Sequence, residues 1–301
     1  MPKISIIGAG NVGSQAAFYS ALRGLGDIVL VDVVDGLAAG KALDMLESMP
    51  IAGVNSKIIG GSDYALTRDS DIVVVTAGIA RKPGMSRHDL IETNSRIMRS
   101  VIPEIGKESP ESILIVVTNP LDEMVHLAHT LSGFPKQRVL GMAGVLDSVR
   151  FRTFIAEELG ADVNDVKAMV LGSHGDLMIP LVEYCTVKGE KISNLLSQEK
   201  IDVIVERVRK GGVEIVKLLK TGSAFFAPGL SIAAMVEAII KDQKNIMPCS
   251  VLLQGEYGVE DVFIGVPVKL GRNGAEEIIE LELNKEERLA FDKSVSQVKT
   301  Q

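Results

Sequence analysis

A glycine-rich turn at residues 8–13, Gly-Ala-Gly-Asn-Val-Gly, lies between an apolar run at residues 4–7 and a helical pattern at residues 12–22. This G-x-G-x-x-G spacing between a strand and a helix is typical of the turn that binds the diphosphate of a dinucleotide. An ordinary glycine turn is the alternative, but Asp32 closes the next apolar run about 20 residues later, as the dinucleotide fingerprint requires. The predicted dinucleotide-binding residues are Gly8, Ala9, Gly10, Asn11, Val12, Gly13 and Asp32.

Asp32 indicates which dinucleotide binds. A carboxylate at this strand end accepts hydrogen bonds from the ribose hydroxyls of the adenosine half and repels the 2′-phosphate of NADP. The residues that follow, Val33, Val34, Asp35 and Gly36, offer no arginine to receive such a phosphate. A solvated strand end is the alternative interpretation of Asp32, and the sequence favours NAD as the cofactor.

The first half of the chain alternates short apolar runs with helical patterns. The apolar runs are rich in Ile and Val, and they occupy residues 4–7, 28–33, 72–76 and 113–118. The helical patterns occupy residues 12–22, 37–49, 89–105 and 121–131. Uniformly apolar strands are buried on both faces, and their alternation with helices is typical of a doubly wound parallel α/β sheet. We therefore predict an N-terminal Rossmann domain at residues 1–143.

The second half of the chain follows a different pattern. Helical periodicity covers residues 146–158, 201–219, 231–241 and 285–299, whereas strand-like runs occupy residues 168–171, 250–254, 262–270 and 278–281. Gly and Asn turns near the last three runs indicate antiparallel pairing. We predict a C-terminal α+β substrate domain at residues 144–301, packed closely on the first domain with a cleft between them.

Charge and cysteine content argue against several classes of protein. The chain has 32 basic and 39 acidic residues, a net charge of −7 and no Trp, so a nucleic-acid partner is not expected. The longest apolar run, residues 72–80, is about half the roughly 20 residues that a membrane span needs, so no membrane partner is expected. Cys185 and Cys249 lie far apart, which excludes a disulfide framework and fits a reducing, cytoplasmic compartment.

Three segments carry residue types that suit acid–base chemistry on an anion. Arg81 and Arg87 lie in a Pro- and Gly-containing segment that follows the run at residues 72–76, which suits a loop closing over an anion. Asp147 and Arg150 are spaced i, i+3, so a helix places both on one face. His174 lies in the turn Gly-Ser-His-Gly-Asp. A solvated basic loop, a surface ion pair and a structural histidine are the respective alternatives.

One reaction class would use all of these groups. Hydride transfer to a carbonyl needs a proton donor near pH 7, which favours His174, and Asp147 is the candidate for orienting its imidazole and stabilising its charge. The planar guanidinium of Arg150 suits the carboxylate of a 2-oxo acid, and a further arginine could polarise the ketone. His126 and His129 are spaced i, i+3, but no Cys or third His lies nearby in the sequence, so no metal is expected.

Several segments resemble the lactate/malate dehydrogenase superfamily. These are the glycine turn, T-A-G-I-A-R-K-P-G-M-S-R at residues 76–87, T-N-P-L-D at 118–122, G-V-L-D-S-V-R-F-R at 144–152, G-S-H-G-D at 172–176 and G-V-P-V-K-L-G at 265–271. They appear in family order and span nearly the whole chain. Ser173 departs from the pattern, since many relatives have Gly there.

The resemblance implies a role for each matching residue. It makes His174 the proton donor and acceptor with Asp147 as its partner, and it places Arg87 on a mobile loop where it polarises the substrate carbonyl. Arg150 would bind the 1-carboxylate, and Asn119 would touch both substrate and cofactor. The residues implied to line the NAD site are Asn94, Val117, Thr118 and Asn119.

Arg81 indicates the substrate within this superfamily. The resemblance implies that malate-type members carry Arg at this position and that lactate-type members usually carry Gln. A second guanidinium pairs with the second carboxylate of oxaloacetate, whereas with pyruvate it would stay unpaired in a closed site. We therefore expect a malate-type NAD-dependent enzyme that forms a homo-oligomer, a dimer or tetramer. A lactate or branched 2-hydroxy acid dehydrogenase and a non-catalytic NAD(H) sensor are the alternatives.

Overall fold

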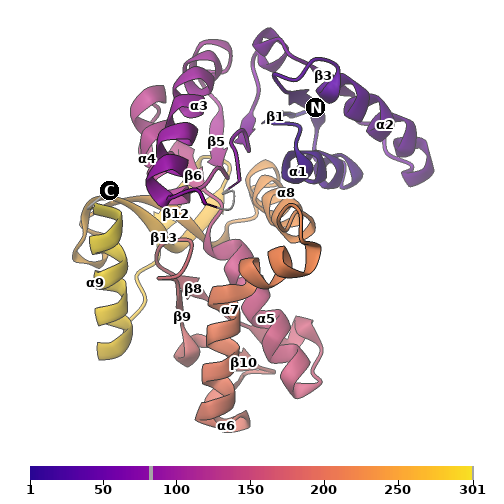
Figure 1. Cartoon of the computed structure of the whole chain (residues 1–301). Helices are drawn as coiled ribbons and strands as arrows, with labels where there is room; N and C mark the ends of the chain where they lie inside the picture. Colours follow the sequence, from indigo (N-terminus) through magenta and orange to yellow (C-terminus); the bar gives the residue numbers. More distant parts are fainter. Residues whose placement is uncertain (81–83, 300–301) are drawn as a thin grey trace.

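A computed structural model describes residues 1–80 and 84–299. Its largest feature within these ranges is a nine-stranded sheet in the order β3-β2-β1-β4-β5-β6-β12-β13-β14. In Figure 1 the N-terminal elements, coloured indigo and purple, form the upper part of the molecule. The first six strands in this order are mutually parallel, which is the strand order of a Rossmann fold. These strands are β1 (Lys3–Ile7), β2 (Asp27–Val31), β3 (Ile58–Gly61), β4 (Ile72–Val75), β5 (Ile113–Val116) and β6 (Val139–Gly141).

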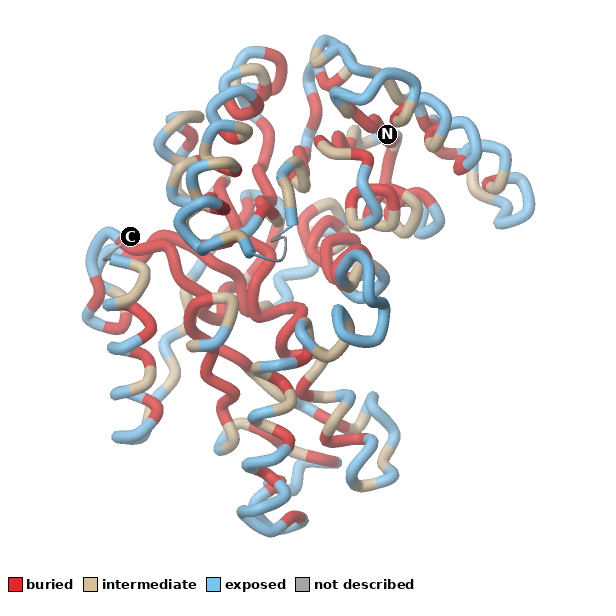
Figure 2. Tube along the Cα trace, viewed as in Figure 1, coloured by how far each residue is buried: buried red, intermediate tan, exposed pale blue. Residues whose placement is uncertain are grey.

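Helices cover both faces of the parallel strands, because the side chains that point to either face of the sheet are apolar. Ile4 and Ile6 pack with α1 and α2, whereas Val73 and Val75 pack with α3 and α4 on the other face. Figure 2 shows buried stretches of chain in the interior and helices whose outer faces are exposed. The predicted doubly wound sheet is therefore confirmed. The four helices are α1 (Asn11–Leu22), α2 (Leu37–Ala52), α3 (Arg87–Glu108) and α4 (Leu121–Ser132).

The C-terminal half extends the same sheet and adds a second helical layer. Three antiparallel strands continue the sheet beyond β6, with Ser250 of β12 opposite Gly141 of β6. Helix α8 packs on α1, so the two halves interlock. The strands of this half are β7 (Val166–Lys167), β8 (Val170–Leu171), β9 (Ile179–Pro180), β10 (Thr186–Val187), β11 (Glu190–Lys191), β12 (Asn245–Gln254), β13 (Glu260–Gly271) and β14 (Gly274–Ile278). Its helices are α5 (Gly144–Leu159), α6 (Ile192–Leu195), α7 (Gln198–Leu219), α8 (Phe226–Ile240) and α9 (Lys285–Lys299).

The structure corrects several sequence-based boundaries. Strands β3 and β6 were not predicted, because Ile-Ile-Gly-Gly and Val-Leu-Gly are too short for a periodic signal. Strand β14 ends at Ile278, where the predicted run at residues 278–281 begins. It is an edge strand that pairs only with β13, so its exposed face tolerates charged residues and the apolar pattern is weak. Helix α3 starts at Arg87, earlier than predicted, because Ser86 and Asp89 form a capping box.

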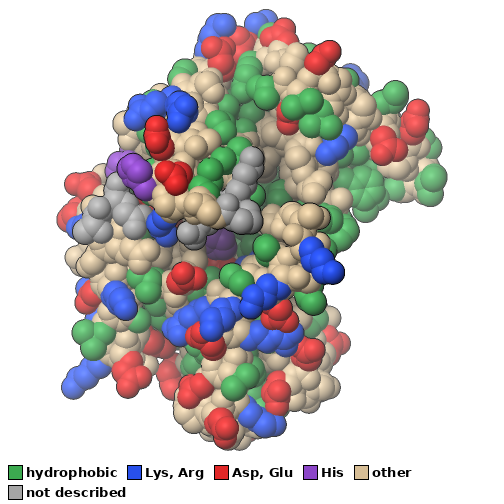
Figure 3. Space-filling view, viewed as in Figure 1, with side chains coloured by type: hydrophobic (Ala, Val, Ile, Leu, Met, Phe, Trp, Pro, Cys, Tyr) green, Lys and Arg blue, Asp and Glu red, His purple; other side chains and the backbone are tan. Residues whose placement is uncertain are grey.

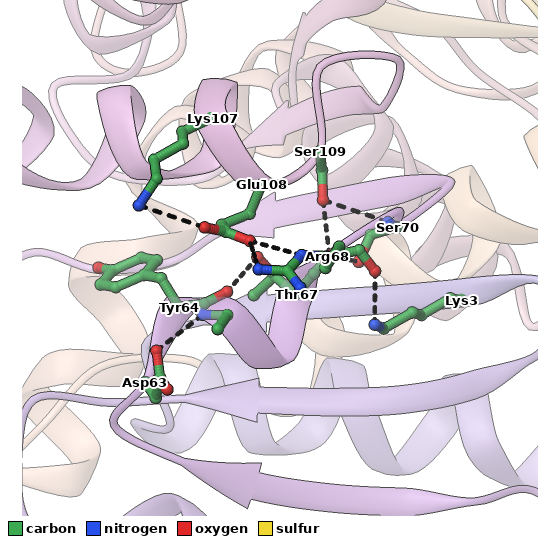
Figure 4. Close-up of polar contacts among 10 residues, drawn as sticks. Lys3, Asp63, Tyr64, Thr67, Arg68, Ser70, Lys107, Glu108 and Ser109 are labelled. Carbon is green, nitrogen blue, oxygen red and sulfur yellow. Dashed lines mark hydrogen bonds and ion pairs between the residues drawn. The ribbon is translucent and has the colours of Figure 1, made fainter.

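A polar network at the amino ends of β1 and β4 has a structural role (Figure 4). Buried Glu108 accepts from Arg68 at 3.0 Å, and Ser109 Oγ donates to the carbonyl of Thr67 at 2.6 Å. Lys3 Nζ donates to the carbonyl of Arg68 at 2.6 Å. These contacts tie the 3₁₀ turn at residues 64–67 to the sheet, and they lie at the opposite end of the strands from the glycine turn.

Ion pairs also organise the surface of the C-terminal half. Figure 3 shows basic and acidic side chains intermixed over the lower part of the molecule. On α7, Arg207 pairs with Glu214 at 3.1 Å and with Glu157 of α5 at 2.7 Å. No helix in the described ranges has the length and apolar character needed to cross a membrane.

Candidate active site

The glycine turn has the geometry that a bound diphosphate requires. Gly8 has φ of +104°, and a Cβ there would lie 2.8 Å from the backbone nitrogen of Ala77. A Cβ on Gly13 would lie 1.9 Å from the carbonyl oxygen of Gly8, so only glycine allows this contact of helix and strand. A Cβ on Gly10, by contrast, would have no protein atom within 4 Å. Helix α1 begins there without a side-chain cap, which leaves N–H donors of its first turn for an anion.

Asp32 ties the end of β2 to the glycine turn. Its carboxylate accepts from the backbone N–H of Ala9 at 2.7 Å and of Val34 at 2.9 Å. A carboxylate has about four acceptor positions, so two remain for ribose hydroxyls. Sequence reasoning missed Lys41 of α2, whose Nζ donates to the Ala9 carbonyl at 2.7 Å and to Ser14 Oγ at 3.1 Å. The residues present therefore fit the adenosine end of NAD.

Gly10→Ala separates folding from cofactor binding. Gly10 has φ of −66°, which alanine adopts readily, and no protein atom crowds the new methyl group. We expect a folded protein whose affinity for NADH falls by about tenfold or more, because the methyl group occupies the space where the diphosphate meets the backbone. Fluorescence titration with NADH measures the loss. Gly13→Ala is the matched comparison and should lower the melting temperature; unchanged NADH affinity in Gly10→Ala would refute the assignment.

The segment that follows β5 packs against the segment that follows β4. Buried Asn94 bridges the two: its Nδ2 donates to the Asn119 carbonyl at 2.6 Å, and its Oδ1 accepts from the N–H of Ile79 at 2.9 Å. Thr118 Oγ1 donates to the Ala77 carbonyl at 2.7 Å. The side chain of Asn94 thus holds the backbone of the site, whereas Asn119 itself is exposed. The implied NAD-lining residues of this segment are Val117, Thr118 and Asn119.

His174, Asp147 and Arg150 form one continuous cluster. His174 Nδ1 lies 2.8 Å from Asp147 Oδ2, and Asp147 Oδ1 lies 3.3 Å from Arg150 Nη1. Burial lowers the pKa of His174, but the charge and hydrogen bond of Asp147 outweigh it, so the pKa is raised overall. Because an ionised carboxylate can only accept, Nδ1 carries the hydrogen and Nε2 stays available as a base.

Arg150 is a largely buried cation with unused hydrogen-bonding capacity. Its side chain is 13% exposed, and its buried Nε has no hydrogen-bond partner among the described residues. A Cβ on Gly211 of α7 would lie 3.2 Å from Arg150 Cδ, so this glycine leaves room for the guanidinium. Sequence reasoning missed Gly211, although a Gly-Gly pair inside an amphipathic helix was a visible signal. A buried guanidinium in this state is suited to an anionic ligand.

The turn that carries His174 is anchored from several elements. The backbone N–H of His174 donates to Asp122 of α4 at 3.2 Å. The N–H of Ser173 donates to Ser294 Oγ of α9 at 2.8 Å, and Gly172 forms an isolated β-bridge with β13. The hydroxyls of Ser173 and Ser294 also pair, at 3.1 Å, so this departure from the family pattern adds a contact to the turn. Sequence reasoning assigned no role to Asp122, although it closes the T-N-P-L-D segment.

The family resemblance implied that Arg87 lies on a mobile loop, but the structure places it at the start of a helix. It is the first residue of α3, is 45% exposed, and its Nη2 lies 2.7 Å from Glu123 Oε1 of α4. The capping box at Ser86 explains this extension of the helix. Arg81, the other arginine of the segment, lies outside the described residues.

His126 and His129 pack against the ring of Phe263, with centroid distances of 5.9 and 5.4 Å. Burial, with a smaller contribution from His126, lowers the pKa of His129. Among the described residues, no group of three or more His, Cys, Asp or Glu side chains is arranged so that it could hold a metal ion.

Packing connects the glycine turn to His174. Gly8 lies against Ala77, Ala77 accepts from Thr118, and Asp122 follows four residues later at the start of α4. Asp122 in turn accepts from the backbone of His174. The glycine turn and His174 are therefore connected through Ala77, Thr118 and Asp122.

Comparison with known families agrees with this geometry. Residues 2–141 match lactate/malate dehydrogenase, NAD binding domain, and residues 144–301 match lactate/malate dehydrogenase, alpha/beta C-terminal domain. The chain belongs to the lactate/malate dehydrogenase family. NAD is the cofactor of this family's N-terminal domain, in agreement with the preference predicted from Asp32.

Relatives of this chain include proteins named malate dehydrogenase and proteins named lactate dehydrogenase. The malate dehydrogenase of Bacillus cytotoxicus is 55% identical over 299 residues, which cover 99% of this chain and 96% of that protein. The apo structure of the malate dehydrogenase from Picrophilus torridus aligns with a TM-score of 0.97 at 51% identity, over 99% of this chain and 95% of that one. A Cryptosporidium parvum lactate dehydrogenase with lactic acid and cofactor aligns with a TM-score of 0.96 at 42% identity, over 99% and 96% of the two chains.

Proposed function

We propose that this chain catalyses reversible hydride transfer between (S)-malate and NAD, giving oxaloacetate and NADH. The observation that carries the proposal is the contact of His174 with Asp147 and of Asp147 with Arg150, in a chain that also has the glycine turn. High identity to relatives named malate dehydrogenase over nearly the whole chain supports the same reaction.

The proposed mechanism assigns each step to a side chain. The guanidinium of Arg150 binds the 1-carboxylate of malate, and Asn119 contacts the substrate from the end of β5. His174 accepts the hydroxyl proton at Nε2 while Asp147 stabilises the resulting imidazolium. Arg87 leaves its ion pair with Glu123, contacts the substrate oxygen and polarises the bond between that oxygen and its carbon. NAD, when bound, supplies the hydride acceptor. In the reverse direction protonated His174 donates its proton to oxaloacetate.

Arg81 is the proposed specificity residue, assigned from the sequence. Its guanidinium would pair with the second carboxylate of malate or oxaloacetate. Lactate dehydrogenase activity is the second candidate, because the Cryptosporidium parvum relative carries that name at similar structural likeness. Arginine at this position disfavours it, since pyruvate would leave a desolvated cation unpaired.

Arg81→Gln tests the substrate assignment. We expect the ratio of kcat/KM for oxaloacetate over pyruvate to fall by about a hundredfold or more, because the charged pair with the second carboxylate is lost and the unpaired cation is removed for pyruvate. NADH oxidation with each substrate, with NADPH as a cofactor control, measures the ratio. A wild-type enzyme that prefers pyruvate, or a variant with the wild-type ratio, would contradict the assignment.

We also propose a compartment, a metabolic role, an oligomeric state and domain boundaries for this chain. The chain would act in the cytoplasm, as its two buried free cysteines suggest, and would supply the malate oxidation step of the tricarboxylic acid cycle. We also propose that it forms a homo-oligomer, a tetramer or dimer, and that residues 1–143 and 144–301 are its NAD-binding and catalytic domains. Analytical ultracentrifugation measures the subunit number directly.

A further inference from the structure

The first turn of α4 holds a buried acid that the mechanism above does not use. Asp122 is 2% exposed, and both of its carboxylate oxygens have partners. Oδ1 accepts from Ser250 Oγ of β12 at 2.7 Å, and Oδ2 accepts from the backbone N–H of His174 at 3.2 Å. The acid therefore contacts the residue that Asp147 orients, from a different helix.

A charge is not needed to make these two hydrogen bonds. An asparagine could accept from the His174 N–H with its carbonyl and donate to Ser250 Oγ with its amide. A buried carboxylate is more costly, because its charge must be desolvated. Burial raises the pKa of Asp122 to about 7, although the hydrogen bond from Ser250 opposes this and Glu123 adds to it. An acid at this position therefore points to a use for its charge.

Three charged side chains among the described residues shift the pKa of His174. Asp147 and Asp122 both favour the imidazolium, and Arg150 opposes it. Within the described residues, α9 and β13 contribute uncharged contacts to this turn, from the Ser294 hydroxyl and from the backbone of Gly265. Asp122 is therefore one of the two described acids whose negative charge raises the pKa of His174, and this charge develops as the pH rises through about 7.

We propose that Asp122 is a second acidic positioning residue for His174: it holds the backbone of the histidine, and its negative charge stabilises the imidazolium that forms when the hydroxyl proton is taken up. This inference rests on the proposed function of His174. It distinguishes two acids by role, because Asp147 orients the ring directly whereas Asp122 acts through the main chain and through space.

The sign of the expected effect follows from the charge. Without the negative charge of Asp122 the imidazolium is less stable, so His174 loses its proton at lower pH. Oxaloacetate reduction needs protonated His174, and its rate should fall at lower pH than in the wild type. Malate oxidation needs neutral His174, and its rate should rise at lower pH.

Asp122→Asn tests the proposal through profiles of kcat/KM against pH in both directions. We expect reduction at about pH 8, relative to its value at about pH 6, to lose a further three- to tenfold compared with the wild type. NADH affinity should be unchanged. Ser294→Ala is the matched control, because it removes a neutral hydrogen bond to the same turn; we expect its rate to fall without movement of the pH limb. If the pH at which oxaloacetate reduction declines is the same in Asp122→Asn as in the wild type, or if it moves equally in Ser294→Ala, the proposal is overturned.

A second variant covers the case in which Asp122→Asn does not fold. Ser250→Ala removes the hydroxyl that favours the ionised carboxylate, so Asp122 stays protonated to higher pH. We expect the pH at which oxaloacetate reduction declines to fall in this variant as well, by a smaller amount. An unchanged pH of decline in Ser250→Ala would also count against the proposal. If the wild type itself shows no activity with oxaloacetate at any pH, the proposed function fails; an active wild type with an unmoved limb in the variants defeats only this inference.

Discussion

His174→Asn is expected to reduce turnover of malate by roughly a thousandfold or more, with little change in NADH affinity. Asparagine can still donate to Asp147, but it cannot take a proton from the substrate hydroxyl. The hydrogen-bonding groups of the glycine turn and Asp32 lie elsewhere, so the cofactor site keeps its structure. The loss should therefore appear in kcat and not in the dissociation constant of NADH.

Stopped-flow and steady-state assays of the same preparations measure both quantities. His126→Asn is the matched control, because His126 of α4 packs against Phe263 of β13 and is not part of the proposed mechanism; its turnover should stay within about twofold of the wild type. A His174→Asn enzyme with turnover within tenfold of the wild type would show that another group moves the proton.

The strands and their helices were predictable because their signal is local. The Ile- and Val-rich run at residues 72–75 is buried on both faces in β4, as its uniform apolarity indicates. The glycine turn is likewise local, since Gly8, Gly10 and Gly13 act within a single strand–helix unit. Strand β6 was missed for the converse reason: three residues carry no period, and only its pairing with β5 and β12 defines it.

The candidate site was predictable only where residue types were already informative. His174 and Asp147 are 27 positions apart, and no local pattern predicts that their side chains meet. Their pairing was first a chemical expectation and was then implied by the family resemblance. Asp122 and Gly211 had no such support, because their roles depend on which elements pack together: β12 brings Ser250 to Asp122, and α7 brings Gly211 to Arg150.

The first turn of α4 brings several proposed functions together. Asn119 precedes it, Asp122 faces the His174 turn, and Glu123 pairs with Arg87 of α3. Binding of the substrate oxygen by Arg87 would remove a cation from Glu123, whose charge acts on Asp122. Substrate binding and proton affinity at His174 would therefore be linked through adjacent acids on one helical turn.

Arg150→Lys is expected to lower kcat/KM for oxaloacetate by about a hundred- to a thousandfold, mostly through KM. Lysine keeps the charge but cannot offer two parallel N–H groups to a carboxylate, although Gly211 leaves room for the side chain of residue 150. Because the positive charge remains near His174, the pH at which oxaloacetate reduction declines should move little. Arg150→Met removes the charge as well, and since Arg150 lowers the pKa of His174, that decline should move to higher pH.

The matched control for Arg150→Lys is Arg152→Lys on the same helix. The guanidinium of Arg152 donates to the carbonyls of Val166 and Val163, both at 2.9 Å, so it supports the fold and not the substrate. We expect this variant to lose about 1 kcal/mol of unfolding free energy while its KM for oxaloacetate stays within about twofold. If Arg150→Lys kept the wild-type KM, or if both lysine variants raised KM equally, the carboxylate would not bind at residue 150. In that case the buried Nε, which has no hydrogen-bond partner in the described part of the chain, would need another explanation, since a desolvated guanidinium donor is costly unless an anion accepts its hydrogen bond.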